Sequence, residues 1–468
     1  MNRAAKVLIL SPLLISATLP AQLSTTGTVS VDLSRASLRG SVCVSNRPAA
    51  AATHFVLNAG LNVARVYDAS GKQLDFAGWD DAVVDGEARV YELVGPEAPQ
   101  TLCVDYVGAF PSYPQHDGPT DFKGLIAFDG QSIRASEQSV WVPEAYDPTT
   151  KERIIPTTFK FHVRCLGCRF LYLNGLPPRA VSEGTFQSGV ERPPLLFGGT
   201  GPWETRGNVT ILNEQLSEAE VQTLAKTFAS IEKFYDAYLG RTVNDKPVLL
   251  RMISVDQKFR DQKQTSWGFA TWPTIALSGS IAQLADALAA RDPTKAYIFP
   301  YLAHETAHYY FGTLNRPSGP YRWMLLESMA EFMAIEAQRA IVGPRAAQQR
   351  LSGMLKVCAK LGAFVPLDRI TDEEQIGDAY RYSYIPLLLF ALEKQAGPPA
   401  MQKFVRALLA SPSPRTWAEM TQLALASGIP ERDWENWGRQ CLGQVTSPCL
   451  THLVAGFSSP ATASARDQ

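Results

Sequence analysis

From residue 25 to about residue 200, apolar and polar residues alternate over short runs, separated by frequent turn residues. Val29–Leu33, Arg89–Val94 and Phe159–Val163 are examples of these runs. Successive side chains of a β-strand point to opposite faces, so a period of two predicts strands with one buried face. The pattern therefore predicts an all-β domain in the first part of the chain.

The period becomes helical after a stretch rich in Gly and Pro between residues 193 and 206. Ser217-Glu218-Ala219-Glu220 forms a capping box, in which the hydroxyl and the second carboxylate satisfy free N–H groups at a helix start. Apolar residues then follow at helical spacing until Gly240, which is a typical helix stop. We therefore expect one long amphipathic helix here.

The next segments mix strand and helix signals. Pro247–Val255 and Ala270–Ser278 read as strands, and a helix is expected to begin near Pro300, where a missing N–H costs nothing in a first turn. From residue 328 to about residue 442 the chain is expected to be helical almost throughout. The sequence thus predicts an α+β multidomain protein, with an N-terminal all-β domain followed by a mostly α domain and C-terminal helices.

The two ends of the chain are expected to lie outside the fold. A short positive start is followed by the apolar stretch Val7–Leu19, which is typical of a secretory signal peptide, and the last residues are small and polar. The expected organisation is a signal peptide (1–22), a β domain (23–200), a second, mostly α domain (207–395), C-terminal helices (396–455) and a disordered tail (456–468).

Composition and charge narrow the class of protein. The formal net charge is −1, so there is no basic surface that would indicate binding to nucleic acid or to an anionic membrane. No later apolar run reaches the roughly 18 residues of a membrane span. We expect a periplasmic or secreted protein without a transmembrane segment in the mature chain, and the sequence leaves its oligomeric state open.

Seven cysteines fit an oxidising compartment. Cys43 and Cys103 lie in strand-like segments and could pair across a sheet, and Cys441 and Cys449 could close a small loop. Cys165-Leu166-Gly167-Cys168 lacks the second pair of a zinc knuckle, so a local disulfide is favoured over a redox motif. The remaining cysteine, at position 358, is expected to be buried.

The candidate chemistry lies in His304-Glu305-Thr306-Ala307-His308, which has the form H-E-x-x-H. Helical residues four apart share one face, about 6 Å apart along the axis, so both imidazoles could bind one Zn²⁺. Eighteen residues (309–326) separate His308 from Glu327, in a second expected helix, and contain enough Gly and Pro to turn the chain back. Two histidines, one carboxylate and an open fourth position predict a catalytic site with one Zn²⁺ per chain.

This spacing resembles that of the aminopeptidase N-type zinc peptidases, which are gluzincins. Tyr309–Thr313 stands where that family tends to carry x-Trp-Phe-Gly-Asn, and Leu326–Glu331 is similar to its Asn-Glu-Gly-x-Ala-Glu run. Tyr382–Glu393 is similar to the Y-x-K-G segment that leads into a helix ending Leu-Glu. The resemblance covers about residues 245–395 and implies a short, divergent member with a thermolysin-like catalytic domain.

Each site residue has an expected role. Glu305 would be the general base, which takes a proton from the zinc-bound water and passes it to the leaving amine. Glu331, one turn past the carboxylate ligand, could accept the second ring N–H of a zinc-bound histidine, or could be a solvated glutamate. The resemblance implies that Tyr382 stabilises the oxyanion, while Tyr380 and Tyr384 remain alternatives for that role.

One departure from the family concerns substrate binding. The family's exopeptidases carry G-x-M-E-N, often followed by Trp-Gly, and its glutamate holds the amino terminus of the substrate. Here Trp267 and Gly268 are present, but Thr265 stands where the carboxylate would be. These three residues are the candidates for substrate binding. We therefore expect an exported zinc metallopeptidase, an aminopeptidase with altered recognition of the amino terminus, with a zinc endopeptidase or a non-catalytic zinc-binding scaffold as alternatives.

Overall fold

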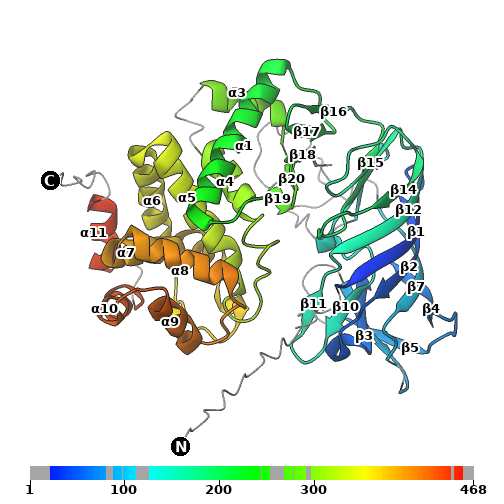
Figure 1. The fold of residues 1–468 in the computed structure, drawn as a ribbon, viewed down its shortest axis with the longest axis horizontal. Helices are drawn as coiled ribbons and strands as arrows, with labels where there is room; N and C mark the ends of the chain where they lie inside the picture. The colour runs from blue at the N-terminus through cyan, green and yellow to red at the C-terminus, as the bar shows by residue number, and fades with distance from the viewer. Residues whose placement is uncertain are drawn as a thin grey trace, which may run out of the picture.

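The computed structural model describes residues 22–80, 88–96, 98–111, 126–243, 245–252, 268–277, 279–290, 297–443 and 447–456. Strands from the first part of the chain gather on one side of the molecule, and helices from the last part gather on the other (Figure 1). A five-stranded sheet built by the middle of the chain lies between them (Figure 1). This is the architecture that the hydrophobic pattern predicts.

The N-terminal part contains three sheets around a shared apolar core. The six-stranded sheet has the order β14 (Glu183–Gln187), β12 (Thr158–Leu166), β1 (Ser24–Asp32), β2 (Ser37–Ser45), β7 (Leu102–Ala109), β4 (Asn62–Asp68). The five-stranded sheet has the order β11 (Glu152–Ile154), β10 (Glu144–Asp147), β3 (His54–Asn58), β6 (Ala88–Leu93), β5 (Phe76–Trp79). The four-stranded sheet has the order β13 (Phe170–Leu173), β15 (Leu196–Gly199), β9 (Ser132–Ala135), β8 (Ala127–Phe128). In β12 the alternation is strict: Phe159, Phe161 and Val163 are buried, and the residues between them are exposed.

The middle of the chain builds a sheet in the order β16 (Trp203–Arg206), β17 (Val209–Leu212), β18 (Val248–Arg251), β20 (Thr274–Leu277), β19 (Gly268–Thr271). Ala270–Ser278 was expected to be one strand, but the structure shows an antiparallel hairpin of β19 and β20 that turns at Trp272 and Pro273. Proline has no N–H to donate to a strand ladder, so Pro273 interrupts the strand. The strand order places β19 at the edge of this sheet.

Helices follow the middle sheet and continue to the end of the described chain. They are α1 (Glu218–Leu239), α3 (Ile281–Ala290), α4 (Ile298–Ala307), α5 (Met329–Ala337), α6 (Pro344–Cys358), α7 (Ile385–Ala396), α8 (Pro398–Ala410), α9 (Trp417–Ala426), α10 (Glu431–Cys441) and α11 (Pro448–Gly456). Two π-helical stretches, Met324–Ser328 and Tyr380–Tyr384, lead directly into α5 and α7. One apolar core runs through all of these helices and includes Leu450 and Leu453 of α11.

The first of these helices, α1, begins and ends as its sequence predicts. The hydroxyl of Ser217 accepts a hydrogen bond from the Glu220 N–H, and the Glu220 carboxylate accepts one from the Ser217 N–H. Gly240 has a φ of 68° at the end of the helix, a conformation that favours glycine. The buried residues follow the expected helical spacing: Val221, Leu224, Phe228, Ile231 and Tyr235.

The expected disulfides are present in the structure. Cys43–Cys103 joins β2 to β7, Cys441–Cys449 joins α10 to α11, and Cys165–Cys168 forms a local bridge between the end of β12 and the turn that follows it. Cys358 is a buried free thiol in α6, as expected. In the part of the chain that the structure describes, we find no helix with both the length and the apolar character needed to cross a membrane.

A buried ionic cluster joins α5 to α7. Glu336 and Glu393 are both almost fully buried, and both accept hydrogen bonds from Arg339, at 2.8 Å for the Glu393 carboxylate. Burial and then the charge of Glu393 raise the pKa of Glu336 to about 8, although Arg339 opposes this. One arginine thus faces two carboxylates, so one of the two carboxylates holds a proton at neutral pH.

This cluster predicts that stability falls as the pH rises. Because the pKa of Glu336 is higher in the folded than in the unfolded chain, its contribution is complete below about pH 4.5 and is lost as the pH rises through about 8. For one proton the slope is at most about 1.4 kcal/mol per pH unit. Thermal unfolding followed by circular dichroism from pH 5.5 to 8.5 should show a smaller loss of melting temperature for Glu336→Gln than for wild type. Substitution of the exposed Glu374 by Gln should leave the wild-type slope unchanged, and equal slopes for all three proteins would contradict the assignment.

Candidate metal centre

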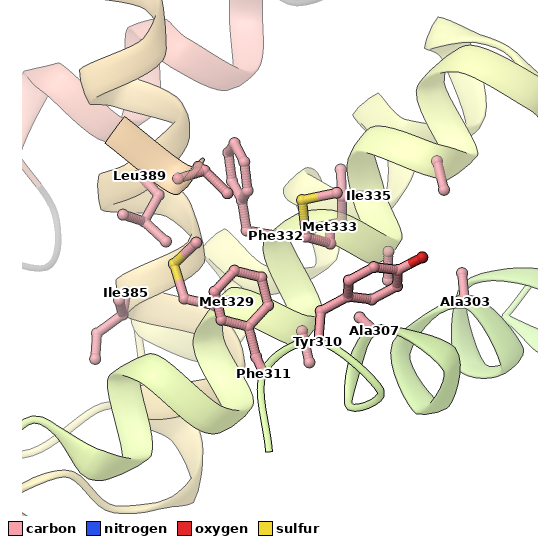
Figure 2. Packing of buried hydrophobic residues seen from close by; sticks show 14 of the residues in the cluster. Ala303, Ala307, Tyr310, Phe311, Met329, Phe332, Met333, Ile335, Ile385 and Leu389 are labelled. Atoms are coloured by element: carbon pink, nitrogen blue, oxygen red, sulfur yellow. The ribbon is translucent and has the colours of Figure 1, made fainter. Parts of the chain in front are cut away.

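The two histidines of the motif lie at the end of helix α4. His304 is in its last turn, His308 directly follows Ala307, and the Nε2 atoms of the two rings are 3.1 Å apart. The adjoining face of α4 carries Ala303 and Ala307, whose small side chains are buried in the same cluster as Phe332, Met333 and Ile335 of α5 (Figure 2). Small residues let two helices approach closely, so α5 packs directly against the helix that carries the histidines.

The carboxylate comes from the π-helical stretch that precedes α5. The Glu327 Oε2 atom lies 3.3 Å from Nε2 of His304 and 3.5 Å from Nε2 of His308. One ligand atom of each residue therefore falls within 4.8 Å of the others. The structure thus brings together the three residues that the sequence singles out. Two imidazoles and one buried carboxylate, aimed at a common point, are a donor set that fits zinc.

Further contacts orient both imidazoles. Nδ1 of His304 lies 3.1 Å from a carboxylate oxygen of Glu331, whose other oxygen accepts a hydrogen bond from Nε of Arg350 at 2.7 Å. Nδ1 of His308 lies 3.0 Å from the carbonyl oxygen of Phe311. Because each Nδ1 has an acceptor, each ring keeps its Nε2 atom free to face the common point. Partners of this kind fix the tautomer and the ring orientation of metal-binding histidines.

The electrostatic field of the site favours a cation. Burial lowers the pKa of His304, but hydrogen bonds to Glu327 and Glu331 outweigh burial and raise that pKa to about 10. Burial also disfavours ionised Glu327, yet the charge of His308 and the contacts with both histidines hold its pKa well below the usual value. The carboxylates that favour a charged imidazole would equally favour a divalent cation at the same place.

Three tyrosines were candidates for the oxyanion position, and only one of them lies at the site. The Tyr380 hydroxyl donates to the carbonyl of Val365, and the Tyr384 hydroxyl donates to carbonyls near the end of α10. The Tyr382 ring is 6.0 Å from the His304 ring, and its phenol lies within the electrostatic influence of the Glu327 carboxylate. Burial and the charge of Glu327 raise the pKa of Tyr382, so its phenol keeps its proton at neutral pH and can donate a hydrogen bond.

Glu305 is buried within the same turn of α4 as His304. One turn earlier, the Tyr301 hydroxyl lies where a Cβ on Gly268 would be, so α4 packs closely against the edge strand β19. Of the expected substrate-binding residues, Gly268 therefore lies beside the zinc-motif helix. Thr265 and Trp267 lie outside the residues that the structure describes.

One acidic residue near the edge strand was missed in the sequence. Both carboxylate oxygens of Glu137 accept from the Thr271 hydroxyl, at 2.7 and 2.8 Å, and Thr271 is the last residue of β19. Burial raises the pKa of Glu137 to about 7, although the Thr271 hydrogen bond and the charge of Arg153 oppose this. Glu137 belongs to the β-rich part and is 134 residues away in sequence, and no local motif marks it.

Comparisons with solved structures identify the fold. The chain is similar to yeast LTA4 hydrolase, with a TM-score of 0.62 and 15% identity over 89% of this chain and 67% of that chain. It is also similar to an M1 zinc metallopeptidase of Deinococcus radiodurans, with a TM-score of 0.57 and 16% identity over 94% of both chains. A form of the latter bound to a Tyr-Ser-Ala substrate gives a TM-score of 0.58 at 16% identity, over 91% of this chain and 95% of that chain. No protein-family model and no curated protein matches the sequence.

The geometry predicts a graded response of metal binding to mutation. Glu327→Ala leaves two protein ligands, so we expect nearly complete loss of zinc from the purified protein. Glu331→Gln keeps all three ligands but removes the charged acceptor at Nδ1 of His304, so zinc affinity should fall by roughly 10–100-fold. Competition with a fluorescent chelator measures both variants, and full zinc occupancy in Glu327→Ala would rule out the ligand set.

Proposed function

We propose that the chain is a zinc-dependent peptidase, with His304, His308 and Glu327 as the metal ligands. The observation that carries this proposal is the convergence of two Nε2 atoms and one carboxylate, in a fold shared with zinc metallopeptidases. Zinc bound there would act as a Lewis acid and would lower the pKa of a bound water molecule to about 7. The fold and the ligand set together support a hydrolase better than a scaffold, because a scaffold would have no use for Glu305.

The other residues supply proton transfer and charge stabilisation. Glu305, the buried carboxylate between the two histidines in sequence, would accept the proton of the attacking water and pass it to the leaving amine. The protonated phenol of Tyr382 would donate a hydrogen bond to the carbonyl oxygen as negative charge develops on it. Glu331 and Arg350 would hold the His304 ring in place while this happens.

We infer an aminopeptidase activity from Glu137. Because β19 packs against α4 and ends at Thr271, the Glu137 carboxylate reaches the edge of the sheet nearest to the zinc motif. A carboxylate at this edge could bind the ammonium group of a substrate. Thr265 cannot do so by charge, because its side chain is neutral. Glu137 would then supply the negative charge from the neighbouring β-rich part.

The same proposal includes export to the periplasm or the cell exterior. Three disulfides form in the structure, and they use all of the cysteines except the one in α6. Disulfides persist in oxidising compartments and are rare in the cytosol. The expected signal peptide lies mainly outside the described residues, so the disulfides are the structural support for export.

Glu305→Gln tests the reaction itself. Glutamine keeps the size and polarity of the side chain but cannot accept the proton, so we expect retained zinc and hydrolysis of unblocked peptides reduced by at least roughly 10²–10⁴-fold. The assay is release of amino acids from a peptide mixture, with and without a zinc chelator. Wild-type turnover in this variant would exclude Glu305 as the base, and chelator-resistant hydrolysis would exclude the zinc mechanism.

A second prediction concerns recognition of the amino terminus. Glu137→Gln should lower kcat/KM for peptides with a free amine by about tenfold or more, and should change hydrolysis of acetylated peptides much less, because only the free amine presents a charge. In the wild type, the preference for a free amine should weaken as the pH falls from 7.5 to 5.5, since Glu137 becomes neutral below about pH 7. Equal rates for free and acetylated peptides in the wild type would instead favour an endopeptidase.

A further inference from the structure

A half-buried patch of two arginines and two aromatic residues lies beside the metal centre: Arg322, Trp323, Arg381 and Tyr382. Trp323 precedes the ligand Glu327 by about one helical turn, and Arg381 directly precedes Tyr382. Of these four residues, only Tyr382 has a role in the mechanism above. The patch therefore places the guanidinium of Arg381 beside the residues that would hold the metal.

The Arg381 side chain is held in this place from two sides. Its guanidinium carbon lies 4.3 Å from the centre of the Trp323 ring and 5.1 Å from the centre of the Tyr382 ring. Its backbone carbonyl accepts a hydrogen bond from the hydroxyl of Ser328, the residue after Glu327, at 2.7 Å. Stacking on aromatic rings and this backbone contact fix the guanidinium relative to the metal ligands before any substrate binds.

The guanidinium retains unused capacity to donate hydrogen bonds. One terminal nitrogen donates to Asp378 at 2.6 Å, but the Asp378 side chain is 82% exposed, so this ion pair is weak. The Nε atom is buried and has no hydrogen-bond partner among the described residues. A buried donor without an acceptor is unfavourable, and a ligand that supplies an acceptor would relieve this cost.

A carboxylate is the ligand that this geometry suits. The planar guanidinium presents donors in a fork that matches the two oxygens of a carboxylate. Arg322, whose guanidinium carbon lies 4.7 Å from the same Trp323 ring, forms an ion pair with Glu373 at 3.3 Å, so Arg381 is the guanidinium that is placed to receive a ligand. The nearby carboxylates of Glu327 and Glu331 face the histidines and Arg350, so we place the acceptor for Arg381 on the substrate.

We propose that Arg381 binds a carboxylate of the substrate close to the bond that is cleaved. The proposal rests on the peptidase function inferred above, and it names the preferred substrates: short peptides whose C-terminal carboxylate falls near the metal, or peptides with an acidic residue next to the scissile bond. Both sources present the same chemical group, and matched peptides separate them.

The test measures binding without turnover. In the Glu305→Gln background loaded with zinc, calorimetry gives the dissociation constants of Ala-Ala-Ala and of its C-terminal amide, and those of Ala-Glu-Ala-amide and Ala-Gln-Ala-amide. We expect at least one carboxylate peptide to bind about tenfold or more tightly than its neutral partner. Additional Arg381→Gln should abolish that ratio. Arg381→Lys, which keeps the charge but loses the fork, should give an intermediate ratio.

Arg439→Gln is the matched control, because it removes the same charge from an exposed position on α10. It should leave the ratio unchanged. Equal weakening of carboxylate and neutral peptides by Arg381→Gln would show that Arg381 only supports Tyr382, and would overturn the proposal. A ratio near one in the Glu305→Gln parent protein would also overturn it, and so would a failure of all four peptides to bind. Failure of the peptidase function is recognised separately, because wild-type protein would then show no chelator-sensitive hydrolysis.

Discussion

The structure depends on burying several charged groups between two helices that pack closely. Removing an imidazole or a carboxylate from water costs several kcal/mol unless a partner compensates. Here each group has one: Glu327 faces both histidines, and Glu331 links His304 to Arg350. The apolar contacts between α4 and α5 hold these partners at hydrogen-bond distance. The same packing therefore both creates the site and makes its burial tolerable.

The β-rich part of the chain contributes to the site as well as to the fold. An apolar cluster that includes Tyr172, Phe197 and Leu250 joins its four-stranded sheet to the sheet that ends in β19. Polar contacts at the same boundary link Tyr172 to Thr274 and Glu137 to Thr271. The edge strand is therefore fixed on one side by α4 and on the other by the β-rich part, so a substrate would meet a rigid edge made by two distant segments.

Local signals in the sequence predict much of this structure. The alternation in β12, the capping box of α1 and the positions of the cysteines are short-range features, and the structure bears them out. The cluster of His304, His308 and Glu327 also follows from spacing. The hairpin at Pro273 was missed because apolar residues continue through it, and Glu137 was missed because only folding brings it to Thr271. Likewise, the sequence could not single out Tyr382, because only the structure shows that the hydroxyls of Tyr380 and Tyr384 donate to backbone carbonyls elsewhere.

The hydrogen bonds of Tyr384 have a consequence for the order of events during synthesis. Its hydroxyl donates to the carbonyls of Cys441 and Leu442, at 3.0 and 3.1 Å, so the segment that carries Tyr382 is anchored to the end of α10. A ribosome makes these residues about sixty positions after the tyrosines, and domains generally fold only as complete units. A nascent or prematurely terminated chain would contain every metal ligand and still lack the support for Tyr382. The segment that carries Tyr382 would thus gain this anchor only after α10 had been made.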